Sequence, residues 1–260
     1  MTSFAAISNF VIQCHERAGA EEHLESYFQG LSQDVCNKWN FHNASLTEFL
    51  STWRERRQDI VPTPVDQPED LESSWAISLS TAQSALVKLE NSDRALLTTK
   101  MLLEGVPIHY QSETCAVDRL EDVRSFMVEG NYVRQMVVHH RPRGNDEDDQ
   151  NKFESLIEYL LVRGPVVASF DVFPSYDEEF TLNMGQGIFK PTPDEHHMRA
   201  YQTFPRHCIV LFGKGVQVQG SDIQEFWEGL ESRGEEFGDE GFVRLARHHC
   251  VIREVVELKV

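Results

Sequence analysis

One apolar stripe, between about residues 74 and 90, constrains the fold of this chain more than any other feature. Its apolar side chains recur at three- and four-residue steps, with polar residues on the opposite side: Trp75, Leu79, Ala82, Leu86 and Leu89. This spacing is typical of an α-helix that packs one face against a core. The preceding residues 60–72 contain three prolines, so we expect an extended loop that leads into the helix.

Helical patterns dominate the first half of the chain, and strand patterns dominate the second half. Amphipathic helices are expected at residues 1–44, 120–128 and 153–161, the last of them stopped by Gly164-Pro165. The capping-box sequence Ser45-Leu46-Thr47-Glu48 predicts another helix, containing Phe49, Leu50 and Trp53. Strands are expected at residues 165–172, 208–212, 215–219, 241–247 and 251–258. This order favours the α+β class, with a helical lobe followed by a sheet lobe.

The charge of the chain argues against several classes of partner. With 24 Lys and Arg against 42 Asp and Glu, the net charge is -18. Such a surface repels phosphate backbones and anionic lipids, so we expect neither a nucleic-acid partner nor a membrane partner. The acidic run at residues 145–149 (NDEDD) is expected to be a solvated loop, and only secondarily a docking patch for a basic partner.

The cysteines and the first residues indicate a compartment. No apolar run reaches 18 residues, and residues 1–19 lack the pattern of a secretory signal. The five cysteines are odd in number and form no CxxC pair: Cys14, Cys36, Cys115, Cys208 and Cys250. Reduced thiols in an intracellular, cytoplasmic protein are therefore the expectation.

Short strings at intervals between residues 50 and 260 carry a more specific signal. They are Trp53-Arg54 with residues 61–67 (VPTPVDQ), then residues 73–78 (SSWAIS), 163–168 (RGPVVA), 187–189 (GIF), 206–213 (RHCIVLFG) and 226–244. In their order and spacing these strings resemble the motifs of the papain-like cysteine proteases. The string SSWAIS is similar to the nucleophile motif Ser-Cys-Trp-Ala-Phe-Ser, and RHCIVLFG is similar to the strand that carries the catalytic histidine.

The resemblance implies a two-lobe papain-like fold for residues 51–260. A helical lobe would occupy about residues 51–160, and an antiparallel, β-barrel-like lobe about residues 161–260. Residues 1–50 would be a helical N-terminal extension, without the helical motif of the usual inhibitory propeptide.

The same resemblance assigns the catalytic positions to Ser74, His207 and Glu231, in place of the family's cysteine, histidine and asparagine. In these proteases the cysteine is a thiolate, stabilised by a helix N-terminus and by the imidazolium. Serine forms no resting alkoxide there and needs His207 as a general base.

Each of these positions also has a structural interpretation. Ser73 or Ser74 could cap the helix, and His207 could be a packed histidine. Glu231 could be an exposed loop carboxylate, either free of His207 or paired with Arg233; alternatively it orients His207 and completes a Ser–His–Glu set.

Other expected parts of the catalytic machinery are missing. The oxyanion glutamine would fall on Pro68, and Gln67 lies one residue out of register; loss of one oxyanion donor typically costs about 10²–10³ in rate. Arg206 stands where the family commonly has an acid, and a positive neighbour disfavours imidazolium. Residues 110–118 (YQSETCAVD) lack the glycine cluster that lines the family's substrate cleft.

No metal or other cofactor is expected. The histidine pairs 139–140, 196–197 and 248–249 lack the spacing of a closed zinc site, and no dinucleotide loop follows a strand.

These observations predict a degenerate papain-like protein, inactive as an enzyme, that acts as a protein-binding or structural subunit within a larger assembly. The alternative is an active serine-type hydrolase that uses Ser74, His207 and Glu231. A third hypothesis is an inhibitor or chaperone-like module that acts through the first 50 residues.

Overall fold

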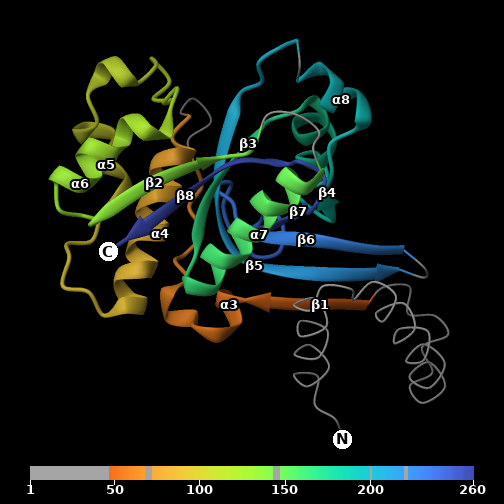
Figure 1. Ribbon diagram of the computed structural model, residues 1–260, viewed down its shortest axis with the longest axis horizontal. Helices are drawn as coiled ribbons and strands as arrows, with labels where there is room; N and C mark the ends of the chain where they lie inside the picture. Colours follow the sequence, from red (N-terminus) through yellow and green to blue (C-terminus); the bar gives the residue numbers. More distant parts are fainter. Residues whose placement is uncertain (1–46, 68–71, 143–146, 200, 220–221) are drawn as a thin grey trace, which may run out of the picture. The chain divides into compact units, whose positions relative to one another are not determined.

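A computed structural model describes residues 47–67, 72–142, 147–199, 201–219 and 222–260 (Figure 1). The helices are α3 (Trp53–Arg56), α4 (Ser74–Glu90), α5 (Thr99–Gly105), α6 (Arg124–Glu129), α7 (Glu147–Arg163) and α8 (Pro193–Met198). Short 3-10 turns lie at Gln58–Ile60, Ile108–Tyr110 and Leu120–Val123, and Tyr176–Phe180 forms a π-helical turn, η5. The strands are β1 (Thr47–Thr52), β2 (Gln135–His140), β3 (Val166–Asp171), β4 (Ile188–Phe189), β5 (Arg206–Gln219), β6 (Asp222–Leu230), β7 (Phe242–Ala246) and β8 (Ile252–Lys259).

The strands form one sheet in the order β2-β8-β3-β5-β6-β7-β4, with β1 paired to β5. Antiparallel pairs dominate, and β4 pairs with β7 in parallel. The path is open, because it ends at β2 on one side and at β4 on the other. The predicted α+β class is confirmed, and the β-rich half is an open sheet rather than a closed barrel.

The two faces of the sheet bury two separate apolar clusters, since successive side chains of a strand point to opposite faces. In β5, Val210 and Phe212 pack in the cluster that contains the apolar face of α4. The intervening Ile209 and Leu211 pack in the cluster that contains Phe153 and the rest of the apolar face of α7. The sheet thus lies between α4 and α7, and the start of β5 is fixed from both sides.

The predicted central helix is confirmed as α4. Trp75, Leu79 and Ala82 are almost completely buried, and the indole Nε1 of Trp75 donates to the carbonyl of Cys115 at 2.7 Å. This packing fixes the N-terminus of α4, where Ser74 lies.

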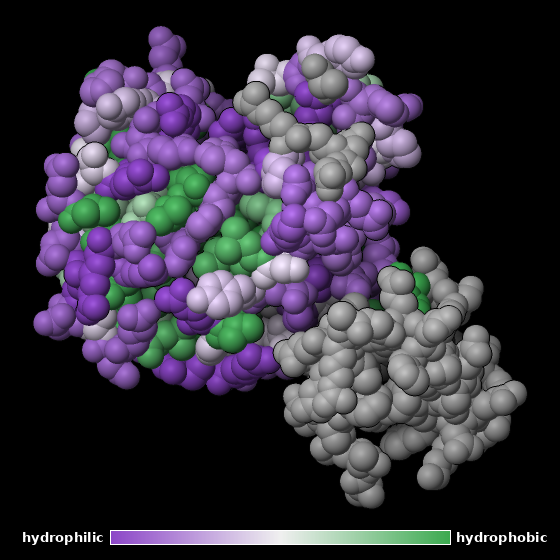
Figure 2. All heavy atoms as spheres, in the orientation of Figure 1, coloured by the Kyte–Doolittle hydropathy of each residue, from purple (hydrophilic) through white to green (hydrophobic). Residues whose placement is uncertain are grey.

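Charged and polar residues cover most of the described surface that Figure 2 shows, as the net charge of -18 leads one to expect. Apolar residues appear on that face in scattered patches.

Two predictions about where helices begin are wrong. Residues 47–52 form strand β1 instead of a capped helix, and the side chain of Thr52, instead of the predicted Ser45, caps the helix that follows, α3. Pairing with β5 overrides the local helix signal. Glu147, Asp148 and Asp149, predicted to lie in a loop, are exposed but open helix α7, because acidic residues in a first turn interact favourably with the helix dipole.

The predicted strands also differ from those in the structure. Residues 208–212 and 215–219 belong to one strand, β5, which passes through Gly213 and Gly215 without a turn. Strands β2 and β6 were not predicted, because QMVVHH and DIQEFWEGL mix polar and apolar residues without clear alternation.

The chain divides into two compact units, residues 1–51 with 215–224, and residues 52–214 with 225–260. In the first, the described residues belong to β1 and to the β5 and β6 ends of a hairpin. The second contains the remaining described elements. The predicted helices in residues 1–44 lie outside the described residues, and the domain boundary at residue 50 and the lobe boundary at residue 160 stay predictions.

Two glycines with positive φ, Gly187 before β4 and Gly238 before β7, test how the chain enters these strands. A Cβ at Gly238 (φ +69) would lie 2.1 Å from the Phe242 carbonyl oxygen, whereas a Cβ at Gly187 (φ +83) would meet nothing within 4 Å. We expect Gly187→Ala to cost about 1 kcal/mol of unfolding free energy and Gly238→Ala roughly 3 kcal/mol or more. Urea unfolding measures both, and equal losses would contradict this placement of the two glycines.

Candidate functional site

The three residues predicted to be catalytic lie at the ends of core elements. Ser74 is the first residue of α4, His207 the second residue of β5, and Glu231 follows the last residue of β6. All three are buried, with 5%, 8% and 2% of their surfaces exposed. The interpretation of Glu231 as an exposed loop carboxylate is therefore wrong.

Glu231 accepts hydrogen bonds on both carboxylate oxygens. His207 Nε2 donates to Oε1, and the backbone N–H of Ser232 donates to the same oxygen at 2.7 Å. The hydroxyl of Tyr176, in η5, donates to Oε2 at 2.6 Å. The predicted contact that orients His207 is thus present, and it includes a tyrosine that the sequence did not reveal.

Aromatic rings surround the imidazole of His207. The antiparallel register of β3 and β5 places Phe170 opposite His207, and the two rings meet edge to face with centroids 5.5 Å apart. The Tyr176 ring lies 6.4 Å from the imidazole and 5.0 Å from the Phe170 ring. In so apolar a setting a hydrogen bond to a charged group is strengthened, because little water competes for it.

The network sets the protonation of its members. Burial opposes ionisation of Glu231, but the charge of His207 and the hydrogen bonds from His207, Tyr176 and Ser232 lower its pKa to about 2. Burial, together with the neighbouring Glu231 carboxylate, raises the pKa of Tyr176 well above its usual value. At neutral pH Glu231 is therefore an anion and Tyr176 a neutral donor.

Ser74 is held by the backbone of β5. The N–H of Cys208 donates to Ser74 Oγ at 3.2 Å, and no hydrogen bond joins Ser74 to His207 in the part of the chain that the structure describes. The capping interpretation is also wrong: Ser73 occupies the N-cap position without a side-chain hydrogen bond, and the Ser74 hydroxyl faces β5.

Cys208 does not replace the missing nucleophile. Burial raises the pKa of its thiol to about 12, so it is protonated at neutral pH, and a thiol in this form is inert.

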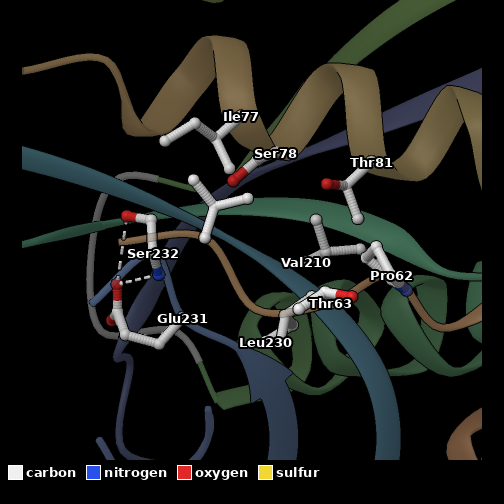
Figure 3. Close-up of a pocket in the computed structure, with 10 residues that line it drawn as sticks. Pro62, Thr63, Ile77, Ser78, Thr81, Val210, Leu230, Glu231 and Ser232 are labelled. Atoms are coloured by element: carbon white, nitrogen blue, oxygen red, sulfur yellow. Dashed lines mark hydrogen bonds between the residues drawn. The ribbon is translucent and has the colours of Figure 1, made fainter. Parts of the chain in front are cut away.

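Gln67 lies beside the network but is tied to Ser232. Its backbone N–H donates to the Ser232 carbonyl at 2.8 Å, and its side-chain Oε1 accepts from Ser232 Oγ at 3.4 Å. Pro68 lies outside the described residues. Figure 3 shows the adjoining cavity between α4 and the Glu231–Ser232 segment; at about 10 Å³ it has room for about one water molecule.

Two arginines near the site have other partners than the sequence suggested. Arg233 pairs with Asp177 at 3.5 Å, so the expectation that it occupies Glu231 is wrong. Arg206 donates through Nη1 to the Asp118 carbonyl at 3.1 Å and to Glu254 at 3.2 Å. It thereby connects the start of β5 to the loop at residues 110–118, which lacks the family's glycines.

The sequence missed Tyr176, Ser232 and the Cys208 N–H. Nothing in the linear pattern connects η5 to the end of β6, and a backbone donor has no sequence signature. The one sequence signal near Cys208 was the string at residues 206–213, which contains His207.

The described residues contain no group of three or more His, Cys, Asp and Glu side chains that could hold a metal ion. His139 and His140 instead contact Glu257, Glu254 and Glu121. Among the described helices, none is long and apolar enough to cross a bilayer.

Comparison with known proteins supports the fold. No family model matches the chain, and no curated protein matches it in sequence. Solved structures do match, and they are papain-like cysteine proteases. One, from a study of the mite allergens Blo t 1 and Der p 1, is 19% identical with a TM-score of 0.57, covering 81% of this chain and 70% of that one.

Two further structures give the same result. Digestive procathepsin L2 proteinase from the larval midgut of Tenebrio molitor is 19% identical (TM-score 0.55; 81% of this chain and 68% of that one). A recombinant stem bromelain precursor is 15% identical (TM-score 0.56; 81% and 70%). The chain therefore has a papain-like fold.

The lowered pKa of Glu231 gives a testable pH dependence. Its ionised form stabilises the fold above about pH 4.5, the ordinary value, and this contribution is lost as the pH falls toward 2. We expect Glu231→Gln to lower the unfolding free energy most above pH 4.5 and progressively less below it, measured by urea unfolding between pH 7 and pH 2.

The matched control is Glu113→Gln, an exposed glutamate, which should leave the unfolding free energy within about 0.5 kcal/mol of the wild type. A Glu231→Gln variant as stable as the wild type at pH 7 would show that the buried network contributes nothing.

Proposed function

We propose that this chain is a catalytically silent papain-like protein that acts as a protein-binding or structural subunit. The hydrogen bond from the Cys208 N–H to Ser74 Oγ carries the proposal. A serine nucleophile needs a base in hydrogen-bond contact with its hydroxyl. His207 donates through Nε2 to Glu231, and its other ring nitrogen makes no hydrogen bond to Ser74 in the described residues.

The surroundings of Ser74 support the same conclusion. Ser74 and His207 are buried, so a peptide carbonyl would reach them only after the site opened. The nearest glutamine, Gln67, accepts from Ser232, and the adjoining cavity holds about one water.

The His207–Glu231 pair has a structural role in this proposal. It joins the start of β5 to the end of β6, and Tyr176 adds η5 to the same carboxylate. Such a network stabilises the relative placement of these segments without any chemical step.

The proposal includes an intracellular location and a protein partner. Cys115, Cys208 and Cys250, the cysteines that the structure describes, are free thiols, as a reducing compartment favours. A fold that keeps its core after losing its nucleophile fits a scaffold in a larger assembly.

One observation favours a second candidate, a serine hydrolase. The imidazole of His207 is oriented by a carboxylate, as in Ser–His–carboxylate enzymes. This function requires the Ser74 hydroxyl, which accepts from the Cys208 N–H, to donate to His207 as well, and requires Glu231 to keep its present contact.

Turnover of a peptide library separates the two candidates. We expect no cleavage by the wild type or by Ser74→Ala, with an active papain-like protease as the positive control. Cleavage by the wild type that disappears in Ser74→Ala would contradict the proposal. In affinity purification from the native source, both forms should capture the same protein partner, because binding does not use the hydroxyl.

Ser74→Ala should also be less stable than the wild type by about 1–3 kcal/mol, because the buried Cys208 N–H loses its acceptor. Ser78→Ala is the matched control, a serine buried on the same helix that makes no hydrogen bond to β5 in the described residues. Urea unfolding measures the unfolding free energy of both variants. An equal loss in the two would contradict a structural role for the Ser74 hydroxyl.

A further inference from the structure

Two arginines contact one buried carboxylate, Asp171, and a third arginine pairs with one of them through its backbone. Arg253, in β8, donates to Asp171 Oδ1 at 2.9 Å. Arg199, which follows α8, places its Nε 2.7 Å from Asp171 Oδ2. Arg141 follows β2. Its backbone N–H donates to the Arg253 carbonyl at 2.8 Å, which places Arg141 beside Arg253.

Charge is unbalanced in this cluster. Asp171 is the carboxylate that Arg199 and Arg253 contact, and Arg141 makes no ion pair within the described residues. Glu195, the nearest other acid to His196, is occupied by Ser175 and Thr192. Three arginines thus accompany one carboxylate, in a protein whose overall charge is -18.

Two guanidinium nitrogens in the cluster are buried donors without a partner among the described residues. They are Arg141 Nε and Arg199 Nη2, whereas Arg199 Nη1 donates to the Cys250 carbonyl at 2.9 Å. A buried donor left without an acceptor costs about 1–3 kcal/mol, and more when it is charged. Such donors therefore call for an acceptor that is not part of the described chain.

Neighbouring titratable groups respond to this positive charge. Burial lowers the pKa of His196, and the charges of Arg199, Arg141 and His249 lower it further, against an opposite effect of Glu195. Burial and the charge of Arg141 also lower the pKa of Arg199, while Asp171 opposes them. Their hydrogen bonds to the Cys250 and Arg253 carbonyls place Arg199 and Arg141 at the same end of β8.

We propose that Arg141 and Arg199, with Arg253 and Asp171 behind them, form a binding site for a phosphate-type dianion. Two negative charges balance the excess of guanidinium groups, and guanidinium donors match the oxygens of phosphate. Arg141 Nε and Arg199 Nη2 are themselves buried, so a ligand enters past the partly exposed side chains of Arg199 and Arg253, which are 14% and 32% exposed. It shares no residue with the papain-like site and does not depend on the proposed function.

Calorimetric titration of the full chain with sodium phosphate, at constant ionic strength and pH 7.5, tests the proposal. We expect saturable binding of one phosphate per chain, and a rise in Tm of about 3–5 °C at tenfold excess over Kd. O-phosphoserine in a parallel titration distinguishes a phosphate ester from free phosphate as the preferred ligand. Sodium acetate should bind at least tenfold more weakly than phosphate.

Arg141→Gln is the informative variant, because Arg141 makes no side-chain hydrogen bond or ion pair in the described residues, so its loss should not unfold the protein. We expect phosphate affinity to fall tenfold or more, with Tm in chloride equal to or above that of the wild type. The matched control is Arg119→Gln, a 66% exposed arginine, which should leave phosphate affinity unchanged.

Absence of saturable phosphate binding to the wild type would overturn the proposal. So would an Arg141→Gln variant that binds phosphate like the wild type, or acetate binding as tight as phosphate binding.

Discussion

A buried carboxylate places the strictest demand on this structure. Glu231 is 2% exposed and ionised at neutral pH, and a charge so far from water must have its donors supplied by the fold. Those donors come from β5 through His207, from η5 through Tyr176, and from the backbone after β6. Segments distant in sequence therefore have to meet at one point, and the sheet and α4 are arranged so that they do.

The position of a catalytic site and its chemistry are separable here. Ser74, His207 and Glu231 lie at the ends of α4, β5 and β6, and His207 is oriented by a carboxylate. The hydroxyl of Ser74, however, is an acceptor for the Cys208 N–H. A cysteine would ionise at such a helix end, whereas a serine has too high a pKa for the helix dipole to correct. In the proposed account, one atom in the side chain decides whether this geometry is reactive.

The parts that could be predicted from the sequence depend on periodic burial. Helix α4 follows from the stripe that begins at Trp75, and β3 follows from the apolar run after Gly164-Pro165. The convergence of His207 and Glu231 followed from motif order. Tyr176, the Cys208 N–H and the cluster around Asp171 could not be predicted, because each depends on partners dozens of residues away. Strand β1 was mistaken for a helix because its pairing with β5 is also distant in sequence.

The proposal that Ser74 is unreactive can be tested most directly with a fluorophosphonate. Mass spectrometry of the intact protein, with an active serine hydrolase labelled in parallel, detects any covalent adduct, and peptide mapping locates it. We predict that the wild-type protein stays unmodified when the control enzyme is fully labelled. An adduct on Ser74 that is absent from the Ser74→Ala protein would contradict the claim that this papain-like site is catalytically silent.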